Sequence, residues 1–179
     1  MSIDAVRRRG AGFIVAAVVL VVAAGLAVWL WPRETDPRTA ATEAALDRAL
    51  DIGGPQGWTS TEPVSMLPQD GQTGETESRD GVLIGINRDS GAFTATWTTT
   101  MTPEACDALA AWAVRVVPST PPDDTRSNCR DSREGAGIFA GAGTEPDANG
   151  RQMFYATADE NSMLTVSLAY KAPADAAAG

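Results

Sequence analysis

The hydrophobic pattern divides the chain into two parts. Residues 11–31 form an apolar run without a single charged or amide side chain, whereas the rest of the chain has only short apolar stretches. As an α-helix, which rises about 1.5 Å per residue, this run spans roughly 31 Å, the thickness of the hydrocarbon core of a bilayer. The pattern therefore predicts a transmembrane helix at 11–31, a stalk at 32–38 and a folded domain at 39–170.

The flanks of the apolar run indicate its orientation. Three arginines directly precede it, and two tryptophans close it at the depth where indole rings favour the headgroup region. The positive-inside rule places residues 1–10 in the cytoplasm and the folded domain outside. The alternative is a cleaved signal peptide, but that would have a shorter apolar region with small residues at its end. The predicted membrane-interface residues are Arg7, Arg8, Arg9, Trp29 and Trp31.

One stripe of the apolar run carries small residues. Gly12 and Ala16, and again Ala23 and Ala27, have small-xxx-small spacing. This spacing lets two transmembrane helices approach closely, although an alanine-rich chain also produces it by chance. It is the basis of one functional hypothesis, an accessory subunit that docks into a membrane complex through its helix.

Two helices are predicted beyond the stalk. Residues 39–52 place apolar side chains on one face and charged ones on the other, and a Gly-Gly-Pro sequence ends the pattern. The second helix starts at Thr102-Pro103-Glu104, which combines a hydroxyl cap, a proline at the first helical position and an acid near the positive end of the helix dipole. We expect this helix to end before Pro118, and residues 118–128 to form a loop.

Alternating patterns predict an antiparallel sheet. The clearest is a hairpin, in which a Val-x-Ile-x-Ile stretch and a Phe-x-Ala-x-Trp stretch are separated by Asp-Ser-Gly. The first strand contains Pro63 and therefore belongs at an edge. The fold class is thus α+β, with about five or six antiparallel strands, two helices on one face, one disulfide, and a disordered tail at 171–179. The predicted strands span 58–66, 82–88, 92–101, 136–142, 152–158 and 163–170.

The charge balance limits the kinds of partner. The chain has 14 basic and 23 acidic residues, a net charge of −9, and no histidine. All acids but one follow the apolar run, which argues against nucleic acid or anionic lipid as a ligand and leaves a cationic partner or simple solubility as interpretations. The absence of histidine excludes Ser-His-Asp and Cys-His catalysis and histidine metal sites. The abundant alanine and arginine are typical of a bacterium with a GC-rich genome.

The two cysteines, Cys106 and Cys129, predict a structural disulfide. In an oxidising compartment an isolated pair forms a bond, and the spacing is not the Cys-x-x-Cys of redox-active sites. Closing the chain between them stabilises the fold by roughly 3 kcal/mol in the chain-entropy model. The bond would tie the loop at 118–128 to the start of the preceding helix. Two cysteines without histidine do not supply the ligands of a structural zinc site.

Two surface features have both a functional and a structural interpretation. One face of the strand at 92–101 carries a ladder of threonines, which binds ice or carbohydrate in some proteins but is also common on solvent-facing strands. Residues 67–80 read as an acidic loop, which serves either recognition or mere connection. The threonines of the ladder are Thr94, Thr96, Thr98 and Thr100.

Three further patterns are weaker. Glu145, Asp147 and Asn149 resemble the first half of an EF-hand loop, but Ala156 occupies the position of the bidentate glutamate, and a hairpin turn explains the same residues. Adjacent acids at 123–124 and 159–160 could serve a glycosidase only if a cleft brought them together. Three tryptophans either fill the core or line a ligand pocket, with the core favoured; these are Trp58, Trp97 and Trp112.

The expected function follows from these features taken together. We expect a cell-membrane protein with a single span and an extracytoplasmic domain that binds an envelope protein or a cell-wall component. No cofactor, metal, nucleic acid or catalytic residue is expected. One alternative is the accessory subunit described above. A carboxylate-based envelope hydrolase is the last alternative.

Overall fold

A computed structural model describes residues 37–64, 74–132 and 137–173. They belong to the second of two compact units, Met1–Thr35 and Asp36–Gly179. The predicted transmembrane segment, its interface residues and the cytoplasmic end lie outside the described residues, and the membrane anchor therefore stays a prediction. Within the described ranges, no helix is long and apolar enough to cross a bilayer.

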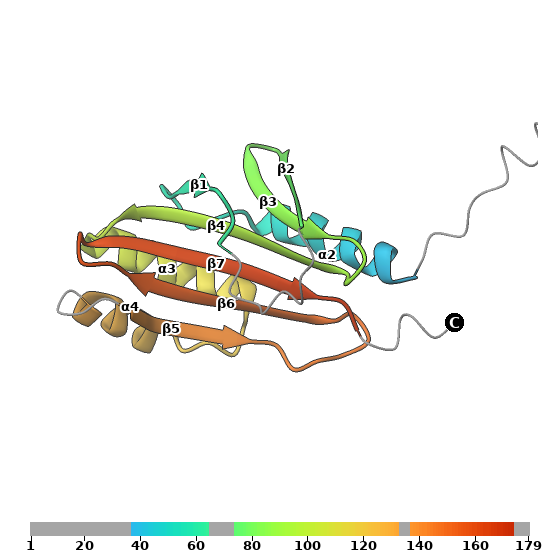
Figure 1. Ribbon diagram of the computed structural model, residues 1–179. Helices are drawn as coiled ribbons and strands as arrows, with labels where there is room; N and C mark the ends of the chain where they lie inside the picture. Colours follow the sequence, from blue (N-terminus) through green and yellow to red (C-terminus); the bar gives the residue numbers. More distant parts are fainter. Residues whose placement is uncertain (1–36, 65–73, 133–136, 174–179) are drawn as a thin grey trace, which may run out of the picture. The chain divides into compact units, whose positions relative to one another are not determined.

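The described residues form three helices and a seven-stranded antiparallel sheet (Figure 1). The strand order is β2-β3-β4-β7-β6-β5, and β1 pairs with β4 beside β3. Because β7 pairs with β4 along its whole length, β1 and β3 share the other edge of β4. The elements are α2 (Pro37–Ile52), β1 (Thr59–Thr61), β2 (Glu75–Arg79), β3 (Val82–Asn87), β4 (Ala92–Thr100), α3 (Pro103–Val116), α4 (Pro122–Asp131), β5 (Gly137–Gly143), β6 (Arg151–Ala158) and β7 (Met163–Lys171).

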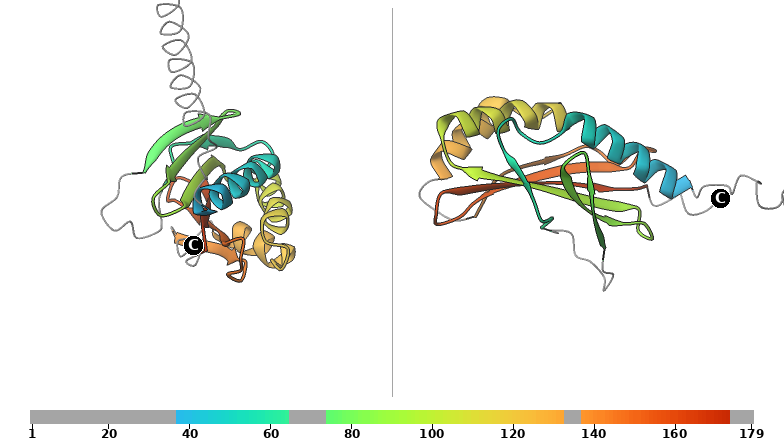
Figure 2. Two further views of the ribbon diagram at one scale, coloured as in Figure 1. Left: turned by 90° about the vertical axis from the view of Figure 1, so that its right-hand side faces the viewer. Right: turned by 90° about the horizontal axis from the view of Figure 1, so that it is seen from above.

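The helices form a single layer on one side of the sheet, as Figure 2 shows. The predicted α+β class, the antiparallel sheet and the placement of helices on one face are therefore confirmed. The β3–β4 hairpin and the three final strands lie close to the ranges predicted from period-two alternation, and α3 begins after the predicted cap and ends before Pro118. The number of helices was wrong, because α4 was not predicted, and the sheet has one strand more than the upper expected number because β2 was also missed.

The core lies between the helix layer and the sheet. Trp112 of α3 packs edge-on against Trp97 of β4 and Phe154 of β6, with ring centroids 5.9 and 5.5 Å apart. Its Nε1 donates a hydrogen bond to the carbonyl oxygen of Gly53, 2.6 Å away, at the end of α2. Trp97 and Trp112 are thus core residues, as favoured, and Trp58 is half-buried against the same core.

Helix α4 replaces most of the loop predicted at 118–128. Its start has helix signals of its own: Pro122 stands in the first turn, and Asp123 and Asp124 lie near the positive end of the dipole. What it lacks is an apolar stripe, since it buries only Thr125 and Cys129. Hydrophobic periodicity therefore could not reveal it.

Other boundaries also differ from the prediction. Helix α2 already begins at Pro37, inside the predicted stalk. Strand β1 covers only Thr59–Thr61, because Pro63 follows and cannot donate to a neighbouring strand. The predicted acidic loop contains strand β2, whose Arg79 forms an ion pair with Glu43 of α2 (2.7 Å). The predicted tail begins with packed residues, since Ala172 is buried and its amide donates to the backbone of the β3–β4 turn.

Candidate functional site

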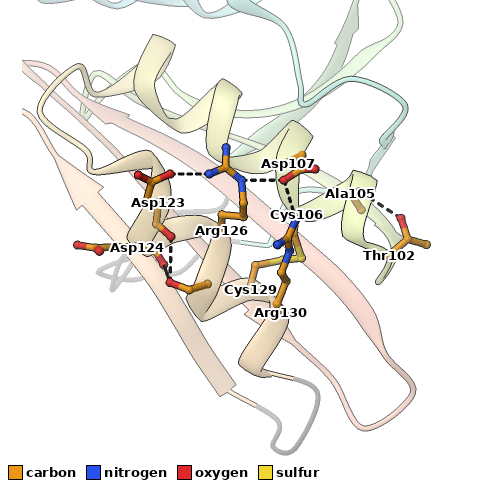
Figure 3. Close-up of polar contacts among 10 residues, drawn as sticks. Thr102, Ala105, Cys106, Asp107, Asp123, Asp124, Arg126, Cys129 and Arg130 are labelled. Atoms are coloured by element: carbon orange, nitrogen blue, oxygen red, sulfur yellow. Dashed lines mark hydrogen bonds and ion pairs between the residues drawn. A yellow bond between two sulfur atoms is a disulfide. The ribbon is translucent and has the colours of Figure 1, made fainter.

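The predicted disulfide is present and joins two helices. Cys106 in the first turn of α3 is bonded to Cys129 near the end of α4, with an S–S distance of 2.05 Å and both residues buried (Figure 3). The predicted hydroxyl cap is also confirmed, because the Oγ1 of Thr102 accepts a hydrogen bond from the amide of Ala105 (3.1 Å). The bond therefore links the N-terminus of α3 to a helix rather than to a loop.

Ion pairs run along the same helix–helix contact. Asp107 of α3 accepts hydrogen bonds from Arg126 (2.7 Å) and Arg130 (3.0 Å) of α4. The Arg126 guanidinium also binds Asp123, and the hydrogen bonds to Asp107 and then Asp123 raise its pKa. One of the adjacent acids considered for catalysis, Asp123, is thus paired with an arginine within α4 (Figure 3).

Two further acidic candidates, Asp147 and Asp159, serve turns. Asp147 Oδ1 accepts a hydrogen bond from the amide of Asn149 (2.7 Å) in the turn before β6. This contact agrees with the interpretation of the EF-hand-like residues as a hairpin turn. Asp159 Oδ1 accepts the amides of Asn161 (2.9 Å) and Met163 (2.7 Å) in the turn between β6 and β7. Over the ranges that the structure describes, no group of three or more acidic or cysteine side chains could hold a metal ion.

The sheet face away from the helices carries a different arrangement, a two-row grid of hydroxyl side chains. Residues paired across antiparallel strands point to the same face, and Trp97, Val166 and Ala156 define the helix-facing side because all three are buried. The alternate positions therefore point away from the helices. The outer row consists of Thr59, Thr98, Thr165 and Thr157, and the inner row of Thr61, Thr96, Ser167 and Tyr155. We call these residues the hydroxyl array.

Two residues of the inner row, Thr96 and Ser167, are buried. Thr96 and Ser167 are 0% and 3% exposed, and their hydroxyl oxygens lie 3.1 Å apart. Thr96 Oγ1 also accepts the amide of Val64 (3.0 Å), from the segment that follows β1. The prediction that the threonine ladder faces solvent was therefore wrong for Thr94 and Thr96, which are buried. The prediction considered strand β4 alone, whereas the segment around Val64 lies against this part of the sheet face.

The other members of the array have exposed surface. Thr98, Thr165 and Thr157 of the outer row are half-buried, and Thr59 is exposed. Tyr155 is also half-buried, and its burial raises the pKa of its phenol, with Arg151 opposing this shift. The outer row and Tyr155 can therefore hydrogen-bond to a ligand.

Tyr155 stands beside small residues. Its cross-strand neighbours are Ser167 on β7 and Gly141 on β5, and its hydroxyl donates a weak hydrogen bond to the Sδ of Met153 (3.5 Å). Because Gly141 has no side chain, the strand position paired with Tyr155 on β5 does not cover the tyrosine ring.

The borders of the array differ in chemistry. On the β3 side, Pro63 lies over Gly85, where an added Cβ would be 3.3 Å from the proline Cβ. On the β5 side, the outer row ends at Ile138, which is 66% exposed. Two exposed cations, Arg151 and Lys171, face each other at the end of β6 and β7. The array itself contains no charged side chain.

Sequence reasoning found only part of this site. It identified the threonines of β4, but a Thr-x-Thr pattern in β1, Tyr-x-Thr in β6 and Thr-x-Ser in β7 carry the same period-two signal. Their alignment into rows depends on cross-strand register. Comparison of the chain with models of protein families, with curated proteins and with solved structures found no match.

Proposed function

We propose that this protein is a membrane-anchored binding module of the cell envelope, without catalytic activity, whose extracytoplasmic domain binds its partner on the sheet face that carries the hydroxyl array. The observation that carries the proposal is that the two faces of the sheet differ in composition and burial. One face is covered by three helices and supplies the core, while the other presents aligned polar side chains across four strands. Binding sites are commonly built on such rigid elements.

The location rests on two independent features. The apolar run at 11–31 with its preceding arginines is long enough to span a bilayer and favours an outside domain. The Cys106–Cys129 bond supports the same side, because structural disulfides persist in oxidising compartments. Both cysteines are used in this bond.

A first experiment tests the location. Intact cells that produce the full chain with a C-terminal tag are treated with protease, and a thiol reagent is added to lysates with and without reductant. We expect the tag to be removed from intact cells, and both cysteines to be labelled only after reduction. A protected tag together with free thiols would refute the extracytoplasmic location.

A second experiment tests the binding role and the alternative of an accessory subunit. The full chain is compared with a chain whose 11–31 segment is replaced by an unrelated apolar anchor, using cross-linking in intact cells and affinity recovery. Recovery of the same partner by both proteins supports binding by the outer domain. Recovery by the native chain alone supports docking through the membrane helix, which the small-residue stripe favours.

A third experiment addresses the hydrolase alternative. The full chain in detergent is incubated with isolated envelope material, and soluble products are measured. Release of fragments that is lost on Asp or Glu substitution would overturn the non-catalytic proposal. We expect binding of the material without cleavage.

A further inference from the structure

The hydroxyl array is an uncharged surface on a strongly acidic protein. The chain carries 23 acidic and 14 basic residues, yet neither row of the array contains one. A cationic peptide or an acidic polymer is recognised best by side chains of opposite charge, and the array offers none. The composition of the array therefore favours a neutral ligand over a cationic peptide or an acidic polymer.

The chemistry of the array matches a polyhydroxylated ligand. Each threonine hydroxyl offers one donor and two acceptor lone pairs, and a sugar hydroxyl offers the same combination. The ring of Tyr155 adds an apolar surface with a polar tip, suited to stacking against the C–H face of a sugar ring. Gly141 beside it leaves room for such a contact.

The dimensions indicate a chain rather than a single sugar. The outer row crosses four strands, from Thr59 on β1 to Thr157 on β6. With about 4.8 Å between strands, it spans roughly 14 Å, which is longer than one sugar ring. The border at Pro63 and Val64 closes one side of the face, whereas the β5 side ends in the exposed Ile138.

We propose that the hydroxyl array binds a neutral polysaccharide of the cell envelope, with Thr98, Thr165 and Thr157 hydrogen-bonding to sugar hydroxyls and Tyr155 stacking on a sugar ring. This inference rests on the proposed function and names its ligand class. Ice, the other ligand of threonine ladders, fits less well. An ice surface requires a flat, exposed lattice, whereas Thr96 and Ser167 are buried and bonded to each other.

The test uses the full chain in a detergent without a sugar headgroup. Biolayer interferometry measures its binding to immobilised dextran, mannan and arabinogalactan, with alginate as an acidic polysaccharide. The variants are the double T98V/T165V, which removes two hydroxyls while keeping β-branched side chains, and Y155A. The matched control is T76V, on an exposed position of β2 away from the array. Unchanged circular dichroism and urea midpoint establish that each variant is folded.

We expect binding to at least one neutral polysaccharide. T98V/T165V removes two hydrogen bonds and should weaken binding about tenfold or more, whereas Y155A removes one stacking contact and should weaken it about fivefold, because a contact of about 1 kcal/mol corresponds to about fivefold in affinity. T76V should stay within about twofold of the native chain. Folded array variants that bind as tightly as the native chain would overturn the inference. So would binding confined to alginate and lost in R151Q/K171Q, which would assign recognition to the two cations.

Failure of this inference is separable from failure of the proposed function. If the native chain binds none of the neutral polysaccharides but still recovers a partner from intact cells through its outer domain, the ligand class is wrong and the binding module stands. If the tag is protected and the thiols are free in the location experiment, the proposed function itself fails.

Discussion

Removal of the disulfide should release helix α4 before it unfolds the sheet. The cysteines are separated by 23 positions, and in the chain-entropy model a loop of this size contributes about 3 kcal/mol to the free energy of unfolding. The double variant C106A/C129A avoids a free thiol and a buried unpaired hydroxyl. We expect its global stability to fall by about 3 kcal/mol, within the 2–4 kcal/mol typical of such bonds.

The loss of stability should be larger in helix α4 than in the sheet. Helix α4 has only ten residues and buries only Thr125 and Cys129, and an isolated helix of this length is not stable in water. Without the bond, the ion pairs of Asp107 with Arg126 and Arg130 are the charged contacts that still tie α4 to α3. Exposed ion pairs of this kind contribute little to stability, because solvent screens them.

Hydrogen exchange measured by mass spectrometry can separate the two effects. Peptides covering residues 117–132 should lose most of their protection in C106A/C129A, while peptides covering β7 stay protected, and protease should cut first within 118–128. Urea unfolding followed by tryptophan fluorescence gives the global change. Unchanged exchange at 117–132, or an equal loss of protection in β7, would refute the reasoning that the bond acts mainly on α4.

Three further predictions concern stability. The hydrogen bond from Arg79 lowers the pKa of Glu43, so the stabilisation is complete above the unfolded-state pKa and disappears as pH falls through the folded-state pKa. E43Q should cost below about 1 kcal/mol at pH 7 and progressively less as the pH falls through the acidic range in urea titrations, and a pH-independent difference would contradict this. A Cβ at Gly54 would overlap the indole of Trp97. We therefore expect G54A to lower the free energy of unfolding by about 1–3 kcal/mol, and by less in a W97F background. Equal losses in both backgrounds would exclude this overlap as the cause. Loss of the cap in T102A should cost about 1 kcal/mol, whereas T102S should retain most of the stability; equal midpoints for all three proteins would show that the cap is dispensable.

Errors in the predicted fold have a common origin. Helix α4 and strand β2 are both polar segments, and both were predicted as loop because neither carries a hydrophobic pattern. Each is held by partners distant in sequence. A disulfide and ion pairs to α3 hold α4, while pairing with β3 and the contact of Arg79 with Glu43 hold β2. Polar segments of this kind are specified by their surroundings rather than by their own periodicity.

The sequence by itself determined the elements whose signals are local. The cap at Thr102 and the following proline start α3, period-two alternation marks the β3–β4 hairpin and the last three strands, and the presence of only two cysteines leaves one possible disulfide. Only the tertiary structure decided that β1, β4, β7 and β6 align their hydroxyl side chains in rows. The short turn at Asp159 sets β6 beside β7, but the alignment of β4 with β1 and with β7 depends on register between strands far apart in the chain. The register is set by how the opposite faces of these strands pack against the helices, which no local pattern contains.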